Sequence, residues 1–264
     1  MNTLGKWLMM IVLISSVAWA QDSPKAPPSA EEIAKANNPL ADILAFNVHY
    51  YYRPRLNGID GGMANTLWFR FAMPTGPVLW RVSAPLETRF INNPTTNFSA
   101  SGLGDIDLFG AYLVKSEPTF TFGIGPSIAF NTGTTDGIGS GRNSLGLAAV
   151  IYAVPIPQIQ IGGLIIWRTD IGGDDTREKV NFIAIQPFYF WQLGKGVYFR
   201  GAPIIPIDLE NGGNYSVPLG IGVGKVAKIE GIVFNFFMEA EPSILVVGTG
   251  QPTTQIFGGV NMQF

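Results

Sequence analysis

The stretch that decides the fold closes the chain: TTQIFGGVNMQF, residues 253–264. Ile256, Val260, Met262 and Phe264 share one face of this stretch with Gly258, whereas Gln255, Asn261 and Gln263 lie on the other. A period of two is typical of a β-strand with one apolar and one polar face. The chain therefore ends in a predicted amphipathic strand.

The first twenty residues predict an export signal. Lys6 precedes an apolar run over residues 7–17, and Ala18 and Ala20 form an A-x-A pattern around Trp19. Because the run is shorter than the ~20 residues that span a bilayer, we interpret residues 1–20 as a signal peptide cleaved near Ala20. An exported chain that ends in an amphipathic strand predicts a β-barrel in the outer membrane of a Gram-negative bacterium.

The composition fits export and disfavours several function classes. Hydrophobic residues make up 47% of the chain and charged residues 14%, yet no stretch after the signal approaches the length of a membrane helix. Removing Lys6 from the 17 basic residues leaves 16 against 19 acidic ones, a net charge of about −3. This balance gives no electrostatic basis for binding nucleic acid. Without cysteine the chain has no disulfide framework.

A short extension precedes the strand-like part of the chain. Residues 21–44 are rich in proline and alanine, and Ser29 with Glu32 forms a capping box that predicts a short helix. We interpret this periplasmic extension as a linker to the first strand in preference to a plug in the barrel mouth, because its length is marginal for a stable helix. Residues 45–264 are predicted to form the barrel.

Twelve strand-like segments follow, separated by loops that alternate between long and short. The segments span residues 46–53, 66–73, 78–90, 102–114, 119–130, 143–153, 159–168, 180–191, 197–206, 215–226, 232–241 and 253–264. Short periplasmic turns and long outer loops on an even number of strands predict an all-β fold, a transmembrane antiparallel up-and-down β-barrel of about 12 strands. We expect bulges where proline interrupts a segment, at Pro126, Pro187, Pro203 and Pro218.

The period of two also separates a lipid face from a lumen face. In the second segment Phe69 and Phe71 share one face, and Trp68 and Arg70 share the other. An arginine in the middle of the lipid face costs about 2–4 kcal/mol, so the charged face is predicted to point inward. The candidate lumen-lining residues are His49, Arg53, Arg70, Arg81, Glu87, Arg89, Asp105, Asp107, Arg168, Arg200, Glu239 and Glu241.

Charges of both signs on this wall predict a polar path that selects solutes. The alternative is a network of ion pairs that fills the barrel, and for Asp105 and Asp107 pairing with the arginines is the role that we expect. Twelve strands place the lumen between a packed eight-stranded barrel and a wide porin. Bulky inward residues narrow it further: Trp68, Phe109, Tyr152, Tyr198 and Phe237. We predict restricted passage of small solutes.

Three short motifs carry a family resemblance: NPLADI at residues 38–43, GLGDI at 102–106 and VPLGIGVGK at 217–225. In these the chain resembles bacterial outer-membrane proteins grouped as transporters of phenol meta-pathway degradation, some of which are labelled neuromedin U. The resemblance implies a porin-like barrel that passes small aromatic or other apolar compounds. It brings no catalytic residues.

The sequence gives little support for a catalytic or metal site. His49, the only histidine, needs a nucleophilic serine and an orienting polar group to act in a hydrolase. Asp170, Asp174 and Asp175 share one loop, but they lack the regular ligand spacing of an EF-hand, so a solvated loop is favoured over a Ca²⁺ site. We therefore predict no enzyme activity, no metal and no cofactor.

The predicted partners are outer-membrane lipid, a small-molecule solute and the outer-membrane insertion machinery, for which Phe264 is the candidate assembly signal. Two other classes stay open. One is a structural or adhesive outer-membrane barrel without transport, and the other is a soluble secreted all-β binding protein. A soluble sandwich turns its apolar faces inward and its charged faces to water, which is the reverse of the barrel prediction.

Overall fold

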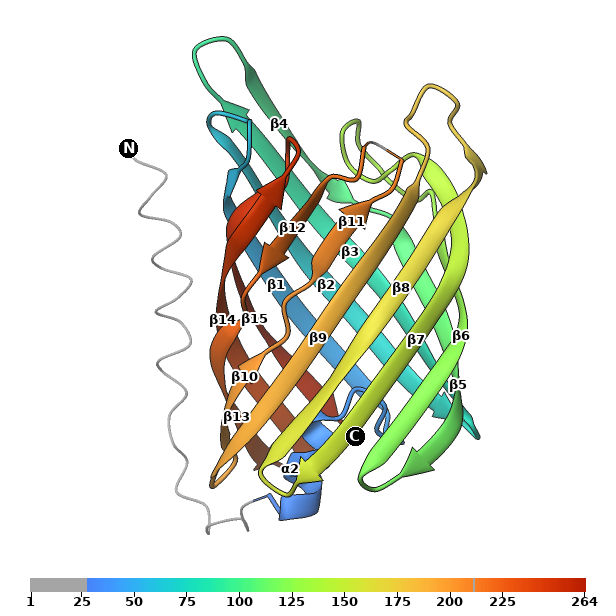
Figure 1. Cartoon of the computed structure of the whole chain (residues 1–264), viewed down its shortest axis with the longest axis vertical. Coiled ribbons are helices and arrows are strands. Elements are labelled where there is room, and N and C mark those ends of the chain that lie inside the picture. Colours follow the sequence, from blue (N-terminus) through green and yellow to red (C-terminus); the bar gives the residue numbers. More distant parts are fainter. Residues whose placement is uncertain (1–27, 211) are drawn as a thin grey trace.

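The computed structural model describes residues 28–210 and 212–264, which form a closed antiparallel β-barrel with one short helix at one end (Figure 1). Each successive crossing of the wall pairs with the one before it, and β1 (Ala45–Leu56) pairs with β15 (Pro252–Gln263) to close the wall. Between them lie β2 (Gly62–Thr75), β3 (Val78–Asn92), β4 (Asn97–Leu103), β5 (Ile106–Glu117), β6 (Phe120–Phe130), β7 (Arg142–Ile156), β8 (Ile159–Gly173), β9 (Asn181–Gly194), β10 (Val197–Gly201), β11 (Ile205–Asp208), β12 (Tyr215–Pro218), β13 (Ile221–Ile229) and β14 (Ile232–Val247).

These fifteen strands make twelve crossings of the wall, because three crossings are interrupted. The interruptions separate β4 from β5, β10 from β11 and β12 from β13. Each of the twelve predicted segments is confirmed as one crossing, and many crossings extend beyond the predicted bounds, as β14 does to Val247. The predicted signal peptide and residues 21–27 of the extension lie outside the described residues.

The four prolines mostly interrupt strand pairing and do not form the bulges that we expected. Proline has no backbone N–H, so one ladder bond is lost wherever it replaces a paired residue. Pro203 lies between β10 and β11, and Pro187 of β9 lies opposite this gap. Pro126 keeps its register with β7, while β5 does not pair with it on the other side. Of the four, Pro218 alone adjoins a register shift.

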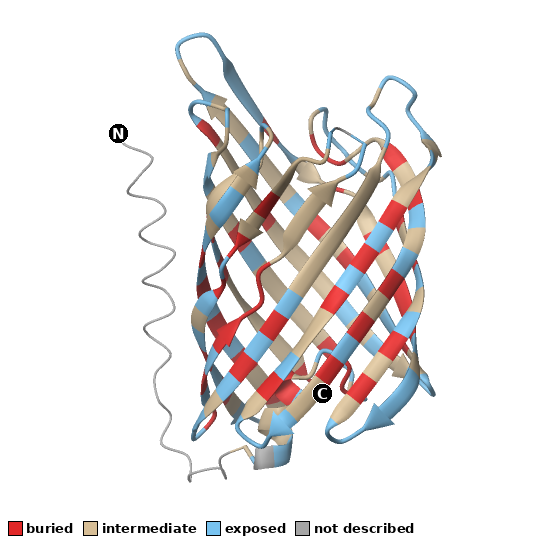
Figure 2. Cartoon of the chain, viewed as in Figure 1, coloured by how far each residue is buried: buried red, intermediate tan, exposed pale blue. Residues whose placement is uncertain are grey.

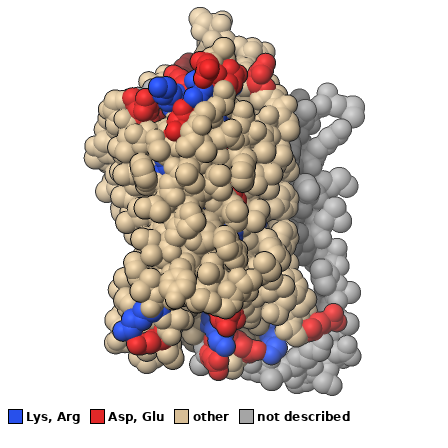
Figure 3. All heavy atoms as spheres, turned by 90° about the vertical axis from the view of Figure 1, so that its right-hand side faces the viewer, with Lys and Arg blue, Asp and Glu red and all other residues tan. Residues whose placement is uncertain are grey.

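Side chains alternate between two environments along the strands, as the alternating colours of Figure 2 show. Large apolar side chains such as Phe71, Trp80 and Leu86 are exposed on the outer face. Lysine, arginine, aspartate and glutamate gather at the two ends and leave a broad uncharged band between them on the face in Figure 3. The exposed apolar face therefore points outward, which suits a barrel in lipid, whereas a soluble sandwich turns its charged faces to water.

Strand β9 is apolar on both faces for a reason that lies inside the barrel. Its outer face carries Tyr189 and Trp191, and its inner face carries Phe188 and Phe190, which are buried against other lumen side chains. The same crowding explains a glycine on β13. A Cβ atom at Gly224 would lie 2.2 Å from the ring of the inward-facing Tyr198.

Helix α2 (Ala30–Asn37) begins with the predicted capping box. The Ser29 hydroxyl accepts from the Glu32 N–H at 3.1 Å, and the Glu32 carboxylate accepts from the Ser29 N–H at 2.8 Å. The helix lies at the end of the barrel where the short turns are (Figure 1), which we call the turn mouth, and the opposite end is the loop mouth. Among the described residues no helix is long and apolar enough to cross a membrane.

Candidate functional site

Residues 36–41, which we call the plug, occupy the turn mouth from inside the barrel. Ala36, Asn37 and Leu40 are buried, and Leu40 joins the cluster of apolar lumen side chains. The side-chain amide of Asn235 on β14 donates to the Ala36 carbonyl and to Asn37 Oδ1, each at 2.9 Å. These contacts fix the segment within the lumen, so our preference for a plain linker was wrong for this part of the extension.

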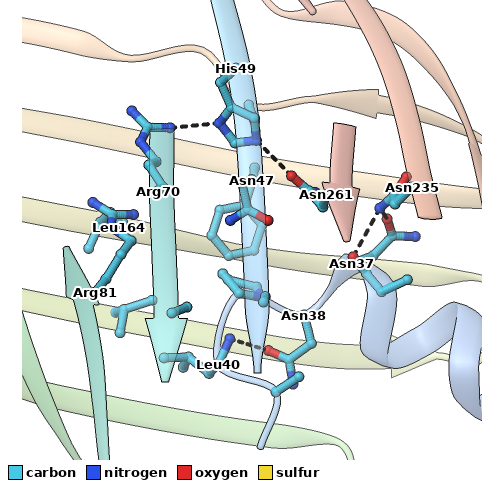
Figure 4. Close-up of a pocket in the computed structure, with 18 of the residues that line it drawn as sticks. Asn37, Asn38, Leu40, Asn47, His49, Arg70, Arg81, Leu164, Asn235 and Asn261 are labelled. Atoms are coloured by element: carbon cyan, nitrogen blue, oxygen red, sulfur yellow. Dashed lines mark hydrogen bonds between the residues drawn. The ribbon is translucent and has the colours of Figure 1, made fainter. Parts of the chain in front are cut away.

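Above the plug lies a cavity of about 150 Å³, the inner cavity, which Figure 4 shows in close-up. Its described lining contains three arginines, Arg70, Arg81 and Arg200, and neither aspartate nor glutamate. The apolar part of its wall includes Leu79, Phe109, Leu164, Phe188 and Phe190. The inner cavity therefore combines positive charge with an apolar surface.

His49 joins two polar groups at the edge of this cavity. Its Nδ1 atom lies 2.7 Å from Arg70 Nη1, and its Nε2 atom lies 2.7 Å from Asn261 Oδ1 (Figure 4). Because a guanidinium only donates, Nδ1 accepts and the Nε2–H donates to Asn261. The ring also makes edge contacts with Phe237 and Phe257. His49 thus orients Arg70, and neither hydrogen bond goes to a serine as a hydrolase would require.

Three buried rings, Tyr51, Phe237 and Phe257, form an aromatic layer on the side of the inner cavity toward the loop mouth. Tyr51 stacks on Phe257 with 4.2 Å between ring centroids, and Phe237 meets Phe257 edge-on at 4.9 Å. The Arg200 guanidinium lies 3.6 Å from the centre of the Phe237 ring. This layer narrows the lumen between the inner cavity and a second one.

The second, outer cavity has a volume of about 520 Å³ and opens toward the loop mouth. Arg53 lines it and donates to Gln255 Oε1 and Thr66 Oγ1, each at 3.1 Å. Glu87 and Arg89 also line it and form an ion pair at 3.1 Å. The outer cavity therefore holds charges of both signs, in contrast to the inner one.

The two buried glutamates of β14 have different partners. Glu239 accepts hydrogen bonds from the Arg200 guanidinium and, at 2.8 Å, from the Ala202 N–H. Glu241 accepts from the Gln255 amide, and its Oε1 atom has no hydrogen-bond partner. Arg200 of β10 and Glu239 of β14 thus form an ion pair across Gly222 of β13, the strand that lies between them.

Apart from the Arg200–Glu239 and Glu87–Arg89 pairs, the alternative of an ion-pair network finds no support among the described lumen residues. Four lumen arginines have no carboxylate within ion-pair distance and lie against aromatic rings: Arg53 against Tyr51, Arg70 against Trp68, Arg81 against Phe109 and Arg168 against Phe182. Cation–π contacts of this kind stabilise a desolvated guanidinium without neutralising its charge.

The predicted pairing of Asp105 and Asp107 with arginines is wrong. Asp105 lies at an interruption of the wall, where its Oδ2 accepts from the N–H and the hydroxyl of Ser140 at 2.7 and 2.6 Å. Asp107 is buried without an ion pair, and its Oδ1 has no hydrogen-bond partner. These contacts depend on a loop that packs back onto the wall, which strand alternation does not reveal.

A charged cluster near the loop mouth was missed from the sequence. Arg142 forms ion pairs with Asp170 at 2.6 Å and with Asp175 at 2.9 Å, while Asp174 accepts from Thr176 in its own loop. No group of three or more metal-binding side chains occurs among the described residues. The signal that could have revealed this cluster is the pairing of β7 with β8, which brings their charged ends together.

Phe264 follows the last residue of β15. Its backbone N–H donates to the Leu44 carbonyl at 3.1 Å, and its side chain is 57% exposed. The structure therefore places an exposed aromatic ring beside the start of β1. Its role as an assembly signal stays a prediction.

Comparisons with known proteins support the fold. No family model matches the chain, and no curated protein matches it in sequence. Among solved structures, the COG4313 outer membrane channel from Pseudomonas putida F1 is similar, with a TM-score of 0.61 and 12% identity over 92% of this chain and 99% of the other. The NanC porin aligns with a TM-score of 0.48 and 11% identity, over 84% of this chain and 98% of its own. At these identities the similarity concerns the fold alone, and the phenol-degradation family is not confirmed.

Proposed function

We propose that this chain is an outer-membrane channel that gives small solutes a restricted passage. The proposal rests on one observation: the barrel combines an uncharged, apolar outer band with an inner face that holds two cavities in series. An outer band of this kind suits hydrocarbon, and a charged interior suits water and polar solutes. The shared fold with an outer membrane channel supports the same function.

The passage is restricted at two levels. The plug occupies the turn mouth, and the aromatic layer narrows the lumen between the cavities. A solute can therefore enter the outer cavity from the loop mouth while the plug stays in place. It can cross the whole barrel only if the plug moves. This arrangement fits selective uptake better than general diffusion.

The cellular setting belongs to the same proposal. Residues 1–20 direct export, the barrel of residues 45–264 inserts into outer-membrane lipid, and the insertion machinery recognises the strand that ends at Phe264. The motifs that resemble the phenol-degradation transporters favour small aromatic or other apolar compounds as solutes. The apolar wall of the inner cavity is compatible with such solutes.

Swelling of liposomes that contain the purified protein tests the passage. Solutes of graded size should enter at rates that fall steeply with size, while liposomes without protein stay unchanged. If none of the solutes enters faster than through bare lipid, the structural or adhesive barrel becomes the better account.

A further inference from the structure

We propose that the inner cavity is a binding site for a small organic carboxylate whose apolar body is about the size of one six-membered ring. The proposal rests on the proposed passage, because a solute reaches this cavity only through the lumen. It goes beyond that function by naming the chemical class of the occupant and the two residues that recognise it, Arg70 and Arg81.

The positive charge of the cavity favours a negatively charged occupant. Of the three arginines in its wall, Arg200 is neutralised by Glu239, whereas Arg70 and Arg81 have no carboxylate within ion-pair distance. The Arg70 and Arg81 guanidinium groups repel each other electrostatically, and Asp107 is the carboxylate that attracts Arg81 most. Asp107 also attracts Arg168. Asp105 attracts Arg168 as well, so two carboxylates oppose the three guanidinium groups of Arg70, Arg81 and Arg168, which leaves an excess of one positive charge.

Each of these arginines also keeps an unsatisfied donor, although Arg70 Nη1 donates to His49. The Nε atoms of Arg70 and Arg81 are buried and have no acceptor. A buried cation without partners is costly, and a planar carboxylate satisfies a guanidinium through two parallel hydrogen bonds. In the register of β2 with β3, Arg70 pairs with Ser83 and Arg81 with Ala72, so the two side chains leave adjacent strands toward the same cavity. One carboxylate can therefore contact both.

An apolar part of the cavity wall favours an occupant with an apolar body. Leu79, Phe109, Leu164 and Phe188 belong to one buried apolar cluster and form one part of the wall, while uncharged polar side chains such as Asn47, Gln186 and Gln263 line another part. The cavity volume of about 150 Å³ is close to that of an engineered apolar cavity, about 150 Å³, that binds benzene. A bare inorganic anion leaves this wall uncovered, and a neutral ring leaves Arg70 and Arg81 without a counter-charge.

Calorimetric titration of the full-length protein in detergent tests the site with three probes. Benzoate carries the ring and the charge, benzamide carries the ring alone, and acetate carries the charge alone. We expect saturable binding of benzoate at neutral pH and binding of benzamide and acetate at least about tenfold weaker, as loss of one charge-assisted interaction implies. Equal affinity for benzamide or acetate, or no binding of benzoate, overturns the proposal.

Variants locate the site. Arg81→Gln should weaken benzoate binding about ten- to a hundredfold, and Arg81→Lys, which keeps the charge, should recover part of the loss. The control is Arg55→Gln, because Arg55 is exposed near the loop mouth. This variant should bind benzoate as tightly as the wild type does. If Arg81→Gln and Arg70→Gln are both folded, judged by heat-modifiable migration, and both bind normally, the site is elsewhere and the proposal fails.

Failure of the site and failure of the passage give different results. Liposome swelling without benzoate binding leaves the passage standing and removes the site. Benzoate binding without swelling or ion current supports the site and removes the passage.

Discussion

Asn37 of the plug and Asn235 of the barrel wall are joined by a hydrogen bond of 2.9 Å that spans 198 residues of sequence. The same Asn235 amide donates to the Ala36 carbonyl, and its oxygen accepts from the Tyr198 hydroxyl. A single side chain thus ties the plug to two crossings of the wall. The plug is held by specific polar contacts as well as by apolar packing.

Replacing this anchor should loosen the plug. Asn235→Leu removes both hydrogen bonds to residues 36 and 37, each worth on the order of 1 kcal/mol, and we expect faster liposome swelling than with the wild type. Asn97→Leu is the matched control, because Asn97 is exposed at the start of β4 and lines neither cavity. Equal swelling rates for wild type and both variants would show that Asn235 does not hold the plug closed.

A pair of neighbouring substitutions tests which face meets lipid. Phe69→Arg places a charge on the outer face of β2 and should impair insertion by about 2–4 kcal/mol. Arg70→Ser changes the inner cavity and should leave a folded barrel with altered ion selectivity. The measurement is the inserted fraction in cells, followed by ion selectivity in a planar bilayer. Normal insertion of Phe69→Arg together with failure of Arg70→Ser would invert the face assignment.

The fold could be predicted from the sequence because its signal is local. Alternation within a strand identifies the two faces without knowledge of the neighbours, and this located Phe69, Arg70 and the other face assignments. The candidate site depends on contacts between distant segments. The docking of residues 36–41 on Asn235 and the pairing of Asp105 with Ser140 leave no periodic signal, so neither could be read from alternation.

The alternation of side chains along a strand also gives the direction in which a side chain points, but not the group that it contacts. It predicts an inward direction for Arg81, which lines the inner cavity, and for Asp107, which is buried. It could not show that Arg81 lies over Phe109 at 4.3 Å or that Asp107 makes no ion pair. For the same reason the charge excess of the inner cavity was hidden, since the twelve candidate residues carry nearly balanced charges when they are counted together.

The docking of α2 should depend on pH through Glu32. The hydrogen bond from Lys228, aided by the Ser29 N–H, lowers the pKa of Glu32 below its ordinary value. Because the folded pKa is depressed, the stabilisation is complete above the ordinary carboxyl range and is lost as the pH falls through the lowered pKa of Glu32. We expect more frequent current openings in acid. Glu32→Gln keeps the capping box but loses the charge, and should show the acid behaviour at neutral pH. Identical traces for wild type and Glu32→Gln at neutral pH would contradict this.

Phe264 should matter for assembly more than for the folded barrel, because its ring is exposed and its backbone makes one hydrogen bond to Leu44. Deleting Phe264 should strongly lower the inserted fraction in cells at native expression, whereas Phe264→Tyr, which keeps the aromatic ring, should insert normally. Unchanged insertion of the deletion variant would remove the proposed role of this residue in recognition by the insertion machinery.

Single-channel recording of the purified protein in a planar bilayer tests the central claim most directly. The proposed channel, closed at the turn mouth by the plug, should give small and discrete current steps. Substitution of the buried Leu40 by Asp should make these steps larger or more frequent, since a carboxylate is costly within the apolar cluster and displaces the plug. A bilayer that contains inserted barrels, wild type or Leu40→Asp, and carries no current above that of bare lipid would contradict the claim that this barrel is a channel.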